Sequence, residues 1–175
     1  MKSFNAIRPV MMGMTLVSLG LLTPMSMAGS FEEIAGQYKQ AYTKQEALPV
    51  PQTQGHVIML TQSKGTGKST NGSGYMDGAQ VVISEIADIS QGNGPHSGYV
   101  TQTMPNGDET VTRFSGRITT TLTPEGQPNT TFAGRLEYVS GSGQYTDITG
   151  SGAYNGHFIS ENEYVVDWSG YYYVP

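Results

Sequence analysis

The stretch Val139–Tyr154 constrains the fold more than any other part of the 175-residue chain. It reads V-S-G-S-G-Q-Y-T-D-I-T-G-S-G-A-Y, so four glycines lie within sixteen residues. Glycine weakens a strand interior, but it accepts positive φ angles and close backbone contacts. We therefore predict a compact turn that links two strands and contributes Tyr145 and Ile148 to the core.

From His56 onward, short runs of β-branched and aromatic residues alternate with turn sequences, which is typical of β structure. The predicted strands are His56–Gln62, Ala79–Ile89, Ser97–Met104, Glu109–Thr121, Thr130–Val139, Ser151–Phe158 and Glu163–Tyr173. A bend in the fourth run at Gly116 would give eight strand segments. The strongest turn signal, Asn106-Gly107, is typical of a β-hairpin. Consecutive hairpins predict antiparallel neighbours, and closure into a barrel removes exposed edges; a two-sheet sandwich is the alternative.

Residues 29–55 are predicted to form an N-terminal helix, over Gly29–Leu48, and a linker. Apolar residues at spacings of three, four and four would form one helical stripe: Phe31, Ile34, Tyr38 and Tyr42. Ser30 is a suitable N-cap, and two prolines follow the predicted helix. The predicted fold is thus all-β: an eight-stranded antiparallel barrel over residues 56–175 with a short N-terminal helix.

Residues 1–28 have the pattern of a signal peptide. Lys2 and Arg8 precede an apolar run over residues 10–22, and Ser26-Met27-Ala28 has the form of a cleavage site. The run is shorter than the ~20 apolar residues of a membrane-spanning helix. We expect export to the periplasm or the extracellular space, with no membrane span after cleavage; an uncleaved anchor is the alternative.

Charge and cysteine content exclude several classes of function. Residues 29–175 carry seven Lys and Arg against fourteen Asp and Glu, a net charge of −7, which is unfavourable for nucleic-acid binding. The chain has no cysteine, which excludes disulfides, thiol chemistry and cysteine-ligated zinc.

The glycine-rich stretch resembles the signature of the allene oxide cyclase/dirigent barrel superfamily, including exported bacterial members. The matching residues are Val139, Gly141, Ser142, Gly143, Tyr145, Ile148, Gly150 and Tyr154, and the segment Gly156–Gly170 is similar to the last hairpin of bacterial members. The resemblance implies an eight-stranded antiparallel barrel with an apolar central cavity. In plant members, such barrels guide cyclisation or radical coupling of hydrophobic small molecules. Several members form oligomers, so homo-oligomerisation stays open here.

Strand alternation nominates five residues for a site in the lumen. Glu85 lies in phase with Val81 and Ile83, so it would be a carboxylate on an apolar face, suited to proton transfer. Asp167, beside Trp168, is a second candidate acid. Tyr154, Tyr164 and Trp168 are candidate ligand-binding residues because aromatic side chains commonly line small-molecule sites.

Other motifs are interpreted as structural. Gly65-Thr66-Gly67-Lys68-Ser69 lacks the first glycine of a phosphate-binding loop and a following helix, so we predict a flexible hairpin loop. Arg113, Arg117, Arg135 and Glu137 are predicted on a solvated outer face with cross-strand ion pairs. The three histidines show no metal-ligand spacing and are expected at the surface or at strand ends, and we predict no metal and no cofactor. Threonine-rich faces argue against an outer-membrane barrel.

Three functions remain. The preferred one is an exported soluble barrel that binds a hydrophobic small molecule in a central cavity. The second is a cyclase or isomerase on the same barrel, with Glu85 or Asp167 transferring a proton. The third is a structural or interaction protein with a filled barrel.

Overall fold

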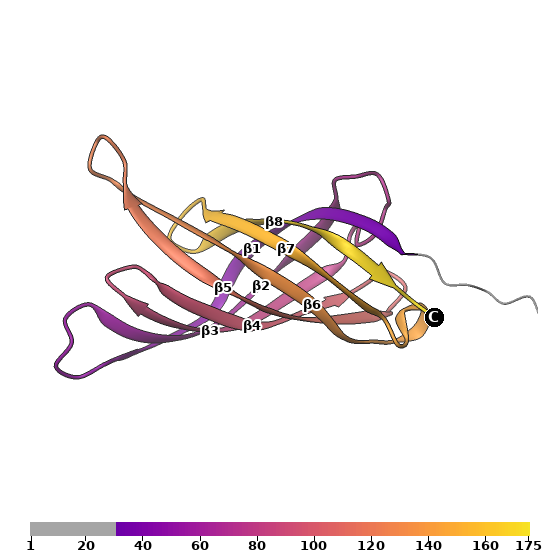
Figure 1. The fold of residues 1–175 in the computed structure, drawn as a ribbon, viewed down its shortest axis with the longest axis horizontal. Helices are drawn as coiled ribbons and strands as arrows, with labels where there is room; N and C mark the ends of the chain where they lie inside the picture. Colours follow the sequence, from indigo (N-terminus) through magenta and orange to yellow (C-terminus); the bar gives the residue numbers. More distant parts are fainter. Residues whose placement is uncertain (1–30) are drawn as a thin grey trace, which may run out of the picture.

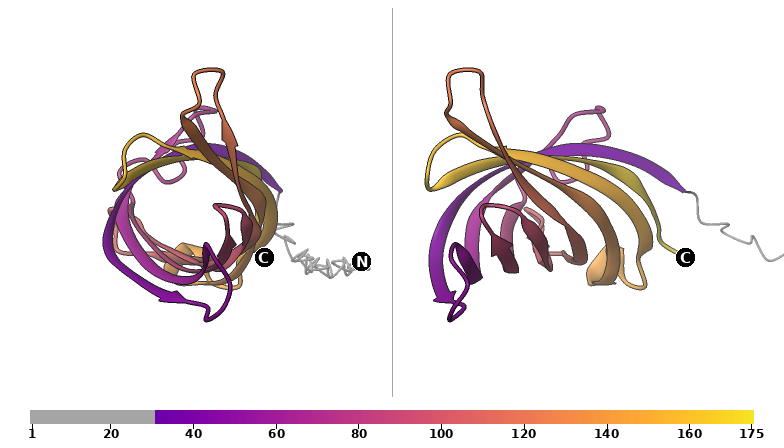
Figure 2. Two further views of the ribbon diagram at one scale, coloured as in Figure 1. Left: turned by 90° about the vertical axis from the view of Figure 1, so that its left-hand side faces the viewer. Right: turned by 60° about the vertical axis from the view of Figure 1, so that its left-hand side comes forward.

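The computed structural model describes residues 31–175, which form a closed antiparallel β-barrel (Figure 1). Its eight strands are β1 Glu32–Pro49, β2 His56–Ser69, β3 Gln80–Ser90, β4 Gly94–Thr103, β5 Glu109–Leu122, β6 Pro128–Gly141, β7 Thr149–Phe158 and β8 Glu163–Tyr173. Each strand pairs with the next in sequence, and β8 pairs with β1. The end-on view in Figure 2 shows the strands encircling one axis, so the sheet has no unpaired edge. The predicted signal peptide lies outside the described residues.

The predicted N-terminal helix is wrong: residues 32–49 form strand β1. β1 pairs with β2 from Gly36↔Ser69 onward and with β8 from Glu32↔Tyr172 onward. Its buried side follows a period of two: Ile34, Gly36, Tyr38, Gln40 and Tyr42 point inward to differing degrees. Two inward positions hold residues that are not apolar side chains, Gly36 and Gln40, so the apolar residues alone do not show the alternation. Phe31, included in the helical stripe, is 71% exposed.

The predicted strand count of eight is correct for a different reason. The 14-residue run Glu109–Leu122 is one continuous strand, β5, and the eighth strand is β1. The segment Gly65–Ser69 is also strand, at the end of β2, so the predicted flexible loop there is wrong. Of the remaining six predicted strands, five match an observed strand to within three residues at each end, and His56–Gln62 covers only the first half of β2.

Close packing of aromatic rings against glycines shapes the barrel interior. Trp168 on β8 is the register partner of Gly36 on β1, and Tyr154 on β7 is the register partner of Gly134 on β6. A Cβ atom at Gly36 would collide with the indole ring, and one at Gly134 would lie 2.5 Å from the Tyr154 hydroxyl oxygen. Large aromatic rings therefore face glycines on neighbouring strands, and this pairing lets the rings pack densely in the lumen.

The Val139–Tyr154 stretch forms the predicted turn between two strands, and it closes one end of the barrel. Gly143–Tyr145 forms a 3₁₀ turn in which Gly143 has a φ of +58°, and Ile148 is buried in the core. The β2–β3 loop contributes two further buried residues to this end, Tyr75 and Met76. The rings of Tyr75 and Tyr145 meet edge to face at 5.7 Å, so the two loops close the same end.

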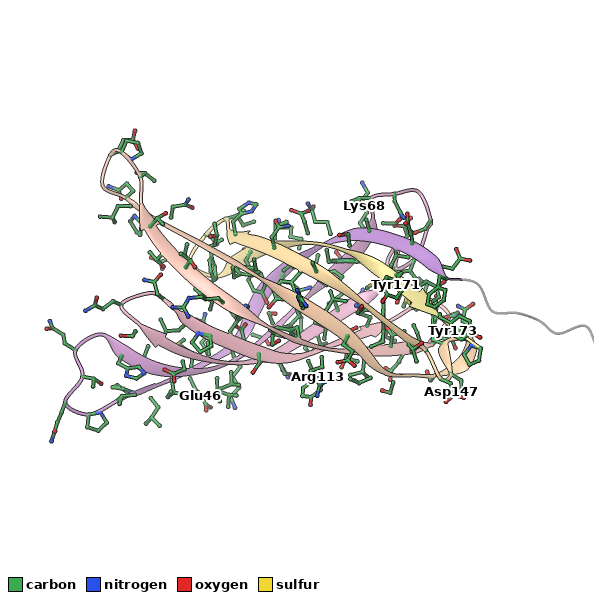
Figure 3. All side chains as sticks on the ribbon, in the orientation of Figure 1. Glu46, Lys68, Arg113, Asp147, Tyr171 and Tyr173 are labelled. Carbon is green, nitrogen blue, oxygen red and sulfur yellow. The ribbon has the colours of Figure 1, made fainter. Side chains whose placement is uncertain are left out.

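The outer face of β5 and β6 is polar, as the alternation predicts. Arg113 and Glu137 are register partners, and a guanidinium nitrogen lies 2.9 Å from a carboxylate oxygen. Both side chains are more than half exposed, and Arg113 points away from the barrel in Figure 3. An exposed pair of this kind contributes little to stability. No helix in residues 31–175 is long and apolar enough to cross a membrane.

Candidate functional site

The barrel lumen retains a cavity of about 50 Å³, walled mainly by aromatic rings. Its aromatic lining consists of Tyr38, Tyr42, Phe114, Phe132, Tyr138, Tyr154, Phe158, Tyr164 and Trp168. Polar groups also reach the cavity from several strands: Glu85, His96, Gln102 and Thr112. A mainly apolar wall with a few convergent polar groups is the usual composition of a small-molecule site.

Glu85, His96 and Tyr154 form a hydrogen-bonded chain along this wall. Glu85 Oε1 on β3 lies 2.8 Å from His96 Nδ1 on β4, and His96 Nε2 lies 3.0 Å from the Tyr154 hydroxyl on β7. The side chain of His96 is 4% exposed and that of Glu85 is 12% exposed. The imidazole ring also contacts the rings of Phe114 and Phe132 edge-on. The chain is thus held in fixed positions by packing as well as by hydrogen bonds.

The chemistry of the three groups fixes the direction of these hydrogen bonds when Glu85 is ionised. A carboxylate only accepts, so His96 Nδ1 carries a proton and donates it to Glu85. In a neutral imidazole, Nε2 is then an acceptor and Tyr154 donates to it. Burial, and then the charge of Glu85, raise the pKa of Tyr154, so its hydroxyl keeps its proton at neutral pH. The arrangement is an acid–base relay that ends on a phenol.

Glu85 is the only aspartate or glutamate among the described residues that line the cavity. Its charge acts on two further tyrosines of the wall. Burial first, and then Glu85, raise the pKa of Tyr42. Burial also raises the pKa of Tyr164, although its hydrogen bond with Ser63 partly opposes the effect. The aromatic wall around Glu85 therefore stays uncharged at neutral pH.

The structure brings four of the five nominated residues together. Glu85, Tyr154, Tyr164 and Trp168 all line the cavity. Asp167 does not, because it lies on the opposite side of β8 from Trp168, where it accepts a hydrogen bond of 2.8 Å from Gln37 Nε2. Adjacent residues of a strand point to opposite faces, so Asp167 and Trp168 cannot both line the lumen.

His96 was missed as a site residue: it was predicted at the surface or at a strand end, and it is buried in the lumen. The residue is 5% exposed and central to the relay. The predicted strand began at Ser97, three residues after β4 begins at Gly94, and therefore left His96 out. His96 is in phase with Val100 and Gln102, which are also buried, so the two-residue spacing was the available signal. The predicted surface position is correct for His157, which is exposed on β7.

A second polar network lies nearer the closed end. Gln102 Nε2 donates to the Tyr38 hydroxyl at 2.5 Å, and Thr110 Oγ1 donates to Gln102 Oε1 at 2.5 Å. Tyr38 in turn donates to the Met76 sulfur at 3.7 Å. This network satisfies buried polar groups and anchors the β2–β3 loop. Residues 31–175 contain no group of three or more side chains that would hold a metal ion.

Comparisons with known proteins give similarity to solved structures alone. No family model and no curated protein match the chain. Among solved structures, the pterocarpan synthase dirigent protein GePTS1 is 14% identical with a TM-score of 0.45, over 93% of this chain and 96% of that chain. PsPTS1, of the same description, is 13% identical with a TM-score of 0.42, over 82% and 95%.

Proposed function

We propose that the protein, after export, binds a compact hydrophobic molecule in the lumen of the barrel. The observation that carries this proposal is the aromatic-walled cavity into which Glu85, His96 and Tyr154 converge. The leader pattern of residues 1–28 supports export. Apolar walls contribute binding energy, and the few polar groups orient the ligand.

Entry of a ring compound requires side chains to move at the end of the barrel opposite the closing turn. The cavity of about 50 Å³ is smaller than typical ligand sites of roughly 300–1,000 Å³. Tyr42 and Phe158 stack at 6.4 Å near the β7–β8 turn, and both are only half-buried. We expect rotation of these two side chains toward solvent to enlarge the cavity and admit the ligand.

Binding is expected to be saturable and to be lost when the lumen is filled. Trp168 is the only tryptophan of the chain and lies in the cavity wall, so its fluorescence reports occupancy. Titration with 1-indanone should change this fluorescence saturably in wild type. Val100→Phe, on the lumen wall, should weaken binding by about tenfold or more because it fills the cavity.

Val139→Phe is the matched control, since Val139 is exposed on β6 and the same substitution there should leave binding unchanged. Equal weakening by both variants would contradict a lumen site. No saturable binding of any ring compound by wild type would favour the filled, structural barrel.

A second candidate, an isomerase- or cyclase-type enzyme, is favoured by the relay itself. In this reaction the Tyr154 oxygen takes a proton from a substrate C–H bond as its own proton passes to His96 Nε2. Glu85 stabilises the resulting imidazolium through its hydrogen bond to Nδ1. Reversal of both transfers at another carbon returns the proton and completes an isomerisation without redox change.

Proton transfer is expected to appear as exchange of the C2 hydrogens of 1-indanone in D₂O, measured by NMR. Glu85→Gln should slow this exchange by about 10²-fold, since general acid–base catalysis typically contributes 10²–10⁴-fold. Asp167→Asn is the control, because Asp167 bonds Gln37 outside the lumen and should have no effect. Binding without exchange above the uncatalysed rate would exclude the enzyme and leave the binding protein.

A further inference from the structure

Two hydrogen-bonding groups of the cavity wall, the Thr112 hydroxyl and the Trp168 indole N–H, have no partner in residues 31–175. Thr112 is 2% exposed and Trp168 is 5% exposed, and both line the cavity. A buried polar group without a partner carries a desolvation penalty, so native proteins keep few of them. Two on the wall of one cavity indicate that something else supplies the partner.

A ring contact of Trp168 and the strand register of Thr112 place both residues toward the closed end of the lumen. The Tyr75 ring packs edge-on against Trp168 at 6.2 Å, and its hydroxyl lies 2.8 Å from that of Tyr138. Tyr138 is the register partner of Thr112. Tyr75 therefore connects the neighbourhoods of Thr112 on β5 and Trp168 on β8. Trp168 is also the register partner of Tyr154, so the relay lies next to it.

We propose that Thr112 Oγ1 and Trp168 Nε1 donate hydrogen bonds to one uncharged acceptor oxygen of a compact ring compound, such as a ketone. This rests on the proposed function. The indole N–H is a donor only, so its partner must be an acceptor. The described lining contains no Lys or Arg, and its carboxylate is Glu85, so an anionic group would be buried without a counter-charge. The ligand oxygen is therefore neutral.

The same two donors serve the relay. Loss of a proton beside a carbonyl group moves negative charge onto the carbonyl oxygen. Donors already directed at that oxygen stabilise the charge as it develops. Thr112 and Trp168 are thus positioned to lower the barrier for the proton transfer that Tyr154 and His96 would carry out.

Calorimetric titration with three ligands of one ring system tests the inference: 1-indanone, indane and indane-1-carboxylate. Wild type should bind the ketone about tenfold more tightly than the hydrocarbon and than the carboxylate. Thr112→Val keeps the side-chain shape, removes the hydroxyl and should reduce the preference for ketone over hydrocarbon about fivefold. Thr119→Val, on the exposed face of the same strand, should leave the preference unchanged.

Stability of the ligand-free protein gives an independent measurement. Removing an unpaired buried hydroxyl should raise the Tm of Thr112→Val by a few degrees. A lower Tm would show that the hydroxyl already has a partner, such as water, and would overturn the inference. Equal affinity of wild type for ketone and hydrocarbon would overturn it while leaving the proposed function intact. No binding of any of the three ligands would overturn both.

Discussion

Gly134→Ala is expected to destabilise the barrel by about 3 kcal/mol or more, because the added methyl group has no free space. The added Cβ would overlap the Ser115 carbonyl oxygen and lie 2.5 Å from the Tyr154 hydroxyl oxygen. The Ser115 carbonyl belongs to the backbone of β5, which pairs with β6 at this point, so it cannot move without distorting the ladder. Urea denaturation, followed by circular dichroism, measures the loss.

Gly126→Ala separates this collision from the ordinary cost of replacing glycine. Gly126 has a φ of +78°, but a Cβ there meets nothing within 4 Å. The free energy of unfolding of Gly126→Ala should fall by only about 1 kcal/mol, because the positive φ is its only cost. If the free energy of unfolding of Gly134→Ala falls by no more than that of Gly126→Ala, the barrel wall accommodates the methyl group. Close packing at Gly134 would then not be required for stability.

Alkaline pH is expected to unfold the protein cooperatively, starting above about pH 10. Burial is the main cause that raises the pKa of six lumen tyrosines well above the ordinary value of 10: Tyr38, Tyr42, Tyr75, Tyr138, Tyr154 and Tyr164. Below pH 10 these hydroxyls are protonated in both states, so their burial adds no pH dependence. Above pH 10 they ionise in the unfolded chain and stay protonated in the folded one. The unfolded state then binds fewer protons, and stability falls as pH rises.

The size of this effect follows from the number of groups. Each tyrosine removes up to about 1.4 kcal/mol per pH unit, so six remove up to ~8 kcal/mol per pH unit. Typical stabilities of 5–15 kcal/mol are exhausted within one or two units. These six tyrosines should therefore add one steep step to the absorbance at 295 nm, and this step should coincide with loss of the β-sheet dichroism.

Tyr42→Phe is the matched variant, because it keeps the ring that stacks on Phe158 and removes one ionising group. Its unfolding midpoint should lie at higher pH, with about one proton fewer released. Gradual ionisation of these six tyrosines near pH 10, in a protein that keeps its β-sheet dichroism, would contradict the buried, uncharged aromatic wall.

Much of the barrel was predictable because alternation is a local property. Val81, Ile83 and Glu85 share a face in any strand, whatever the strand pairs with. The glycine-rich turn was also predictable, since Gly143 takes a φ that other residues rarely adopt. β1 was not, because Gly36 and Gln40 interrupt its apolar pattern. Gly36 is required under Trp168, and Gln40 accepts a hydrogen bond from Ser63. The residues that explain Gly36 and Gln40, Trp168 and Ser63, lie on other strands.

The amino-acid sequence by itself determined the β class, the closing turn and the side chains that share each strand face. Only the tertiary structure decided which face is the lumen. Closure of the sheet through β1 and β8 turns Trp168 inward and Asp167 outward, and it makes β1 a strand. The β3–β4 pairing brings His96 against Glu85, and the curvature of the closed sheet brings His96 against Tyr154 on β7, 58 residues away. Such contacts depend on strand pairing and register across the whole barrel, which no local pattern specifies.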